Sequence, residues 1–76
     1  MITIELKFFV TLSKYLPDSA AAYLVTPGKT VSDLIDELNI PIDDVKLIFV
    51  NGRKEGLDYE VKDGDRLGLF PPVGGG

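Results

Sequence analysis

The sequence contains neither cysteine nor histidine among its 76 residues. Without cysteine the chain can form no disulfide framework and no thiolate nucleophile, and without either residue it lacks the usual ligands of a zinc site. It also lacks the side chain whose unperturbed pKa lies near neutrality. We therefore expect a fold stabilised by packing alone, no metal site, and a protein that is not itself an enzyme.

Positive charge is also scarce, with 8 basic against 12 acidic residues and a net charge of −4. Such a chain is repelled by phosphate backbones and anionic membranes, so we expect no nucleic-acid or membrane partner and favour a protein with a basic surface. The N-terminus carries charges unlike a signal peptide, and no apolar run approaches the roughly 18 residues of a membrane span. These features predict a cytoplasmic protein.

Alternating polarity in the first third of the chain indicates two strands with a short helix between them. Residues 2–10 predict a strand whose core side carries Ile2, Ile4, Leu6, Phe8 and Val10. Phe9 falls on the opposite, otherwise polar side. Residues 11–16 predict a short helix that stops before Pro17, and residues 20–26 predict the second strand.

The period then changes to that of an amphipathic helix over residues 30–39. Its apolar stripe is Val31, Leu34, Ile35 and Leu38. Thr30 is placed to cap the helix with Asp33 three residues later, and Pro41 lies just beyond the expected end.

The last third of the chain predicts three more strands and two turns. Residues 47–50 form a strand, Asn51-Gly52 suits a type I′ hairpin turn, and a short edge strand follows. A turn at residues 62–65 precedes a final strand over 66–70, with Leu67 and Leu69 on its core side. The acidic residues at 43–44 and 58–65 are interpreted as parts of solvated loops. Their spacing does not match that of a calcium-binding loop.

These elements predict an α+β fold of the β-grasp, ubiquitin-like type, a mixed four- to five-stranded sheet packed against one main helix. The final strand can lie parallel beside the first, in the middle of the sheet. We expect one domain over residues 1–70 and a flexible C-terminal tail over residues 71–76.

The tail has the composition of a projecting arm, Pro71, Pro72, Val73, Gly74, Gly75 and Gly76. The two prolines cannot continue a sheet and keep the chain extended, so six residues can reach about 20 Å. Glycines let a backbone pass through a narrow channel and leave the terminal carbonyl carbon unshielded. A carboxylate must first be activated, and the chain has no phosphate-binding loop of its own, so an external enzyme would have to consume ATP. The plainer alternative is a frayed, inert end.

The segment Phe70-Pro71-Pro72-Val73 ending in Gly75-Gly76, preceded by Asp63-Gly64-Asp65 and Leu67, resembles the C-terminal signature of the MoaD/ThiS family of sulfur carriers. The likeness is nearest to the small subunit of molybdopterin synthase. Arg53 and Lys54 depart from it, because the corresponding positions in close members are apolar.

The resemblance implies a route for sulfur. An E1-like enzyme of the MoeB/ThiF type would adenylate Gly76 with ATP, and a sulfur donor such as a cysteine desulfurase or rhodanese would convert the adenylate to a thiocarboxylate. The large, MoaE-type subunit would then use that sulfur to build molybdopterin. The resemblance also implies that Phe9 and Phe70 contact these partners and that no cofactor is permanently bound.

Three other uses of the same chain stay open. The sulfur could serve thiamin, cysteine or tRNA thiolation. Gly76 could instead be joined to lysines of target proteins, as in a ubiquitin-like modifier. The domain could also be an interaction module with an inert tail.

Overall fold

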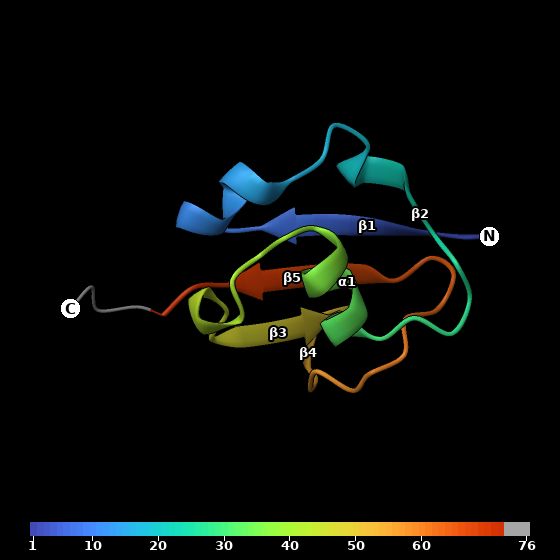
Figure 1. Ribbon diagram of the computed structural model, residues 1–76. Coiled ribbons are helices and arrows are strands. Elements are labelled where there is room, and N and C mark those ends of the chain that lie inside the picture. The colour runs from blue at the N-terminus through green and yellow to red at the C-terminus, as the bar shows by residue number, and fades with distance from the viewer. Residues whose placement is uncertain (73–76) are drawn as a thin grey trace.

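The protein, described over residues 1–72 of a computed structural model, is a five-stranded sheet with α1 packed on one face (Figure 1). The strands are β1 (Ile2–Phe8), β2 (Tyr23–Val25), β3 (Leu47–Val50), β4 (Arg53–Lys54) and β5 (Arg66–Phe70), and the α-helix is α1 (Val31–Glu37). Three short 3-10 helices are η1 (Val10–Tyr15), η2 (Ala20–Ala22) and η3 (Ile42–Asp44). The strand order is β2-β1-β5-β3-β4. β1 and β5 are parallel and the other pairs antiparallel, which confirms the predicted β-grasp arrangement.

The core lies between the sheet and α1. Alternate residues of the two central strands point into it, and the helix supplies the facing layer. The buried set from these three elements is Ile4, Leu6, Phe8, Leu67, Leu69, Val31, Leu34 and Ile35. Burying each such side chain stabilises the fold by about 1.5–3 kcal/mol. Val61, which precedes β5, is also buried, although no periodicity marks it in the sequence.

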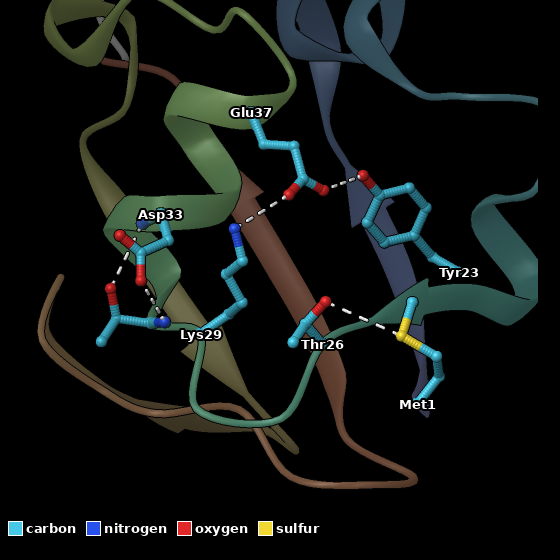
Figure 2. A network of polar contacts seen from close by, with 7 residues as sticks. Met1, Tyr23, Thr26, Lys29, Asp33 and Glu37 are labelled. Carbon is cyan, nitrogen blue, oxygen red and sulfur yellow. Dashed lines mark hydrogen bonds and ion pairs between the residues drawn. The ribbon is translucent and has the colours of Figure 1, made fainter.

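The start of α1 has the predicted cap (Figure 2). The Thr30 Oγ1 accepts the Asp33 N–H at 3.2 Å, and the Asp33 Oδ2 accepts the Thr30 N–H at 2.9 Å, so the two residues form a complete capping box. The hydrogen bond from the Thr30 backbone is the main reason why the pKa of Asp33 falls below its usual value.

The end of α1 comes earlier than predicted, at Glu37 instead of residue 39. Asn39 adopts a φ of 60°, and its N–H bonds the Asp36 carbonyl while the Ile40 N–H bonds the Ile35 carbonyl. This pair of bonds is the Schellman motif, with asparagine in the left-handed position that glycine usually takes. Ile40 turns back into the core and closes the end of the helix.

A polar network joins α1 to β2 on the helix side of the sheet (Figure 2). The Tyr23 hydroxyl donates to Glu37, whose other oxygen lies 3.5 Å from the Lys29 Nζ. Burial and the hydrogen bond to this carboxylate raise the pKa of Tyr23 to about 12. The network therefore ties an edge strand to the helix.

The first strand ends at Phe8, so the prediction that it extends to residue 10 is wrong. Phe9 makes one last ladder bond, from its N–H to the Leu69 carbonyl at 3.1 Å. Val10 then has a φ of 53° and is 74% exposed, instead of lying in the core. The turn is fixed by the burial of Leu12 and by the Ser13 hydroxyl, which donates to the Val10 carbonyl.

The second strand is also shorter than predicted. Residues 20–22 are three alanines, which have weak strand propensity, and they form η2 instead of a strand. The bonds from the Ala20 N–H to the Pro17 carbonyl and from the Ala22 N–H to the Ser19 carbonyl hold this turn. Only Tyr23–Val25 pairs with β1.

Candidate partner-docking site

Three phenylalanines gather on the face of the sheet opposite α1, and we call them the aromatic cluster: Phe9, Phe49 and Phe70. The rings of Phe9 and Phe70 stack with centroids 4.2 Å apart and planes 8° apart. Phe49 meets Phe70 edge-on at 5.5 Å and 81°. Both arrangements are favourable for aromatic pairs. The cluster combines the residue that follows β1 with residues of β5 and β3, at the end of the sheet where β5 stops.

The sequence placed Phe9 and Phe70 on the outer face, and the structure brings the two into contact there. Phe9 is 38% exposed. Phe49 was missed as a site residue, although the alternation within residues 47–50 puts it opposite the buried Ile48 and Val50. The outward phenylalanine in a strand was the available signal.

A solvent-open hollow of about 380 Å³ lies beside the aromatic cluster, over β5. Its floor is Gly68, which pairs with Lys7 on one side and with Phe49 on the other. Arg66 lines the end of the hollow away from Phe70. The outer face of the sheet therefore presents a concave, largely apolar surface.

The charge of this face differs from that of the whole chain. By strand register, Lys7, Arg66 and Lys54 share it with a single acid, Glu5. The net charge of −4 led us to expect a basic partner surface, yet the residues around the aromatic cluster are mainly basic. The local charge, not the total, decides what binds here.

A buried carboxylate organises the Arg66 end of the hollow. Asp65 was predicted to lie in a solvated loop, but it is only 6% exposed, which corrects that interpretation. It accepts hydrogen bonds from the Lys62 N–H, Asn51 Nδ2 and Tyr59 hydroxyl at 2.8, 2.8 and 2.9 Å. Burial alone would raise the pKa of Asp65, but these three donors outweigh it and lower the pKa.

The Asn51-Gly52 turn is held by the same group of residues. Their φ values of 54° and 82° confirm the predicted type I′ turn. The Asn51 Oδ1 accepts the Arg66 N–H at 2.9 Å while its amide donates to Asp65. The start of β5 and the β3–β4 hairpin are thus locked together.

The predicted tail begins where the aromatic cluster ends. The Phe70 carbonyl accepts the Lys46 N–H at 2.8 Å, Pro71 is buried, and Pro72 is exposed. The chain therefore leaves the packed domain between the two prolines. The predictions for Val73, Gly74, Gly75 and Gly76 fall outside the described residues.

Metal-binding groups and membrane-spanning helices are both absent from residues 1–72. No group of three or more acidic side chains there is arranged to hold a metal ion. No helix of this part of the chain has the length and apolar character needed to cross a membrane.

Comparison with known proteins identifies the family. The sequence matches the Mut7-C ubiquitin family over residues 1–74. The chain belongs to this family. A search of curated proteins gave no significant match.

Solved structures with the same fold include a molybdopterin converting factor subunit and small archaeal modifier proteins. A Pyrococcus furiosus protein provisionally named molybdopterin converting factor, subunit 1, is 31% identical with a TM-score of 0.73, covering 96% of this chain and 100% of its own. Small archaeal modifier protein 1 of Haloferax volcanii is 25% identical with a TM-score of 0.73, covering 96% and 100%. Urm1 of Trypanosoma brucei, at 19% identity, a TM-score of 0.64 and coverage of 97% and 95%, supports the fold alone. The resemblance to ubiquitin-like sulfur carriers and modifiers is confirmed.

Proposed function

We propose that the chain is a sulfur carrier that acts as the small subunit of molybdopterin synthase, with the sulfur held on the carboxyl of Gly76. The similarity to the Pyrococcus furiosus protein, which spans the full length of that chain, carries the proposal. The aromatic cluster at the root of the tail adds to it, since exposed aromatic rings in contact make a suitable anchor for a partner protein.

The chemistry needs little from this chain beyond its terminal carboxyl group. An E1-like adenylating enzyme joins that carboxylate to the α-phosphate of ATP and releases pyrophosphate. The persulfide of a sulfur donor, such as a cysteine desulfurase or rhodanese system, then attacks the acyl carbon and displaces AMP. A second thiol reduces the resulting acyl disulfide by two electrons, which leaves a thiocarboxylate on Gly76 and a disulfide on the donor. The 76 residues contain no thiol, so the acyl carbon is where sulfur can be carried. The large synthase subunit then uses that sulfur to build molybdopterin.

Within this proposal the domain serves as the part that partners recognise. Phe70 directly precedes Pro71, after which the chain leaves the packed domain, so an enzyme that holds the cluster also positions the tail. Pro72 keeps the emerging backbone extended because its φ is fixed. The chain has no histidine, so it lacks the side chain whose unperturbed pKa lies near neutrality.

The test is reconstitution with the adenylating enzyme, a sulfur donor and the large synthase subunit. Deleting Gly75 and Gly76 should abolish molybdopterin formation while circular dichroism shows an unchanged fold. One residue added after Gly76 should do the same, because an amide then replaces the carboxylate. Full activity of either variant would refute the proposal and favour an interaction module with an inert tail.

A ubiquitin-like modifier is the second candidate, favoured by the similarity to the Haloferax small archaeal modifier protein. Mass spectrometry of the protein from its native cells separates the two. A gain of about 16 Da at the C-terminus, one oxygen exchanged for sulfur, supports the carrier. Branched glycine remnants on lysines of other proteins support the modifier. If the sulfur is delivered to thiamin, cysteine or tRNA, these spectra show the same C-terminal thiocarboxylate and do not distinguish the acceptor.

A further inference from the structure

The edge of the sheet at β2 carries backbone groups that the sheet does not use. Thr3, which pairs in register with Leu24, donates its N–H to the Asp63 Oδ1 at 2.9 Å, and its carbonyl accepts the Gly64 N–H at 2.8 Å. Both groups of Thr3 therefore point away from β2. Such a pair is a non-hydrogen-bonded one, so the N–H and carbonyl of Leu24 also point away from β1. Because β2 is the outermost strand, they face the open edge, and no partner bonds them within residues 1–72.

The side chain of Leu24 is exposed beside these groups. Leu24 is 59% exposed, whereas Val25 is buried in the core and the hydroxyl of Tyr23 bonds Glu37 on the helix side. Met1 is 75% exposed, and its Sδ lies near the start of the loop that follows β2, where it contacts the Thr26 Oγ1 at 3.7 Å (Figure 2). The edge therefore offers apolar side chains together with one donor and one acceptor.

This edge also lacks charge. No charged residue occurs between Asp18 and Lys29, and Lys29 itself is paired with Glu37 at 3.5 Å. Edge strands are commonly protected from pairing with another chain by lysines or other charges, and β2 has none. The chain as a whole carries a net charge of −4, which repels a second copy. The uncharged edge is thus a place where two copies can approach closely.

We propose that β2 pairs antiparallel with β2 of a second copy of this chain, about a two-fold axis at Leu24. The N–H of each Leu24 donates to the carbonyl of the other, and the two leucine side chains lie about 5 Å apart on the outer face. A two-fold axis satisfies both groups of both copies, because one residue supplies the donor and the acceptor. The ladder extends no further at Ala22, which lies in η2 and bonds the Ser19 carbonyl.

The dimer leaves the start of the tail open in both copies. Leu24 lies level with Thr3, near the start of β1, whereas the parallel strand β5 ends at Phe70. Self-pairing and the aromatic cluster therefore occupy opposite ends of the sheet, and the dimer does not depend on the proposed function. Two hydrogen bonds and one leucine pair make a small contact, so the dimer should be weak, half formed at roughly 0.1–1 mM.

Sedimentation equilibrium of the full chain, from about 10 µM to about 1 mM, tests the dimer. The apparent mass should rise from 8.3 kDa toward twice that value. Leu24→Lys sets two like charges opposite each other, and Leu24→Pro removes the outward N–H without breaking a bond to β1. Each should raise the dissociation constant at least tenfold. Hydrogen exchange followed by NMR should show the Leu24 N–H exchanging more slowly as the protein concentration rises.

Leu57→Lys is the matched control. Leu57 is 40% exposed and lies in the segment after β4, the strand at the other end of the sheet order. Its carbonyl accepts the Ser32 N–H, a backbone bond that a change of side chain leaves in place. The variant adds the same charge as Leu24→Lys. Its dissociation constant should stay within about twofold of wild type if position, not total charge, matters.

The other outcomes overturn the proposal. A wild type that stays monomeric at about 1 mM would leave this edge to a strand of a different protein. A dimer that Leu24→Lys does not weaken, or that Leu57→Lys weakens equally, would lie elsewhere on the surface. Slow exchange of the Leu24 N–H at every concentration would reveal a partner within one copy. Circular dichroism checks the fold, and if Leu24→Pro unfolds, the test rests on Leu24→Lys at the same exposed position.

Discussion

Replacing Asp65 by asparagine tests the claim that one buried carboxylate locks β5 to the β3–β4 hairpin. Three donors converge on its two oxygens at 2.8–2.9 Å, and Asn presents an amide NH₂ where one oxygen stood. At least one of the three donor groups then faces the asparagine NH₂, which is itself a donor. Loss of a charge-assisted bond and one unsatisfied group give a cost of about 2–4 kcal/mol. That is a large part of the roughly 4–11 kcal/mol expected for a 76-residue domain.

The lowered pKa of Asp65 determines how the effect of Asp65→Asn on the free energy of unfolding depends on pH. The pKa of Asp65 is lowered in the folded state from an ordinary value of 3.8, so its contribution is complete above that value and is lost as pH falls through the lower, folded pKa. Urea unfolding followed by circular dichroism should therefore show a large deficit for Asp65→Asn at pH 7. The deficit should shrink as pH falls below 3.8 and should vanish once pH is below the lower, folded pKa, where the wild type also carries no charge at Asp65.

Asp18→Asn is the control for this measurement, because Asp18 is exposed and makes no side-chain hydrogen bond within residues 1–72. It should change the unfolding free energy by less than about 0.5 kcal/mol. A deficit below that size for Asp65→Asn, or one that stays constant from pH 7 to pH 2, would refute the reasoning.

Three further changes test separate parts of the fold. Tyr23→Phe should lower the free energy of unfolding by about 1 kcal/mol at pH 7, because the hydrogen bond to Glu37 is lost. The folded pKa of Tyr23 is raised to about 12, so this deficit, measured by urea unfolding, should vanish as pH rises from 10 to 12. Val10→Asn should raise the melting temperature by a few degrees, because asparagine tolerates a φ of 53° and the valine buries little; a lower melting temperature would mean that the valine packs. Thr30→Ala should cost about 1 kcal/mol by breaking the capping box with Asp33, whereas Thr30→Ser, which keeps the hydroxyl, should unfold within about 0.5 kcal/mol of wild type.

The features that the sequence predicts correctly are those that depend on residues close together in the chain. The ranges of β3 and β5, the hairpin at Asn51 and the capping box at Thr30 each depend on residues a few positions apart, and the structure confirms them. The parallel pairing of β1 with β5 was expected because the order of elements resembles the β-grasp arrangement, in which the last strand can lie beside the first, and the structure has this pairing.

Two of the errors occurred where burial or tertiary contacts override the local pattern. The alternation of apolar residues reaches Val10 and therefore predicts a longer strand. In the structure the chain turns at Val10, so that Leu12 is buried. Asp65 looks like any turn acid until Asn51 and Tyr59, 14 and 6 residues away, bring their donors to it. Such contacts leave no periodic pattern in the sequence.

The candidate site gains its precision from being built on the central strand. β5 is paired on both sides, so Phe70 and Gly68 are held by β1 and β3 at once. The Arg66 end is fixed by Asn51 and the Phe70 end by the bond to Lys46. The same strand runs directly into Pro71. A partner that grips this face therefore holds the start of the tail in a fixed position, which a docking surface on α1 would not do.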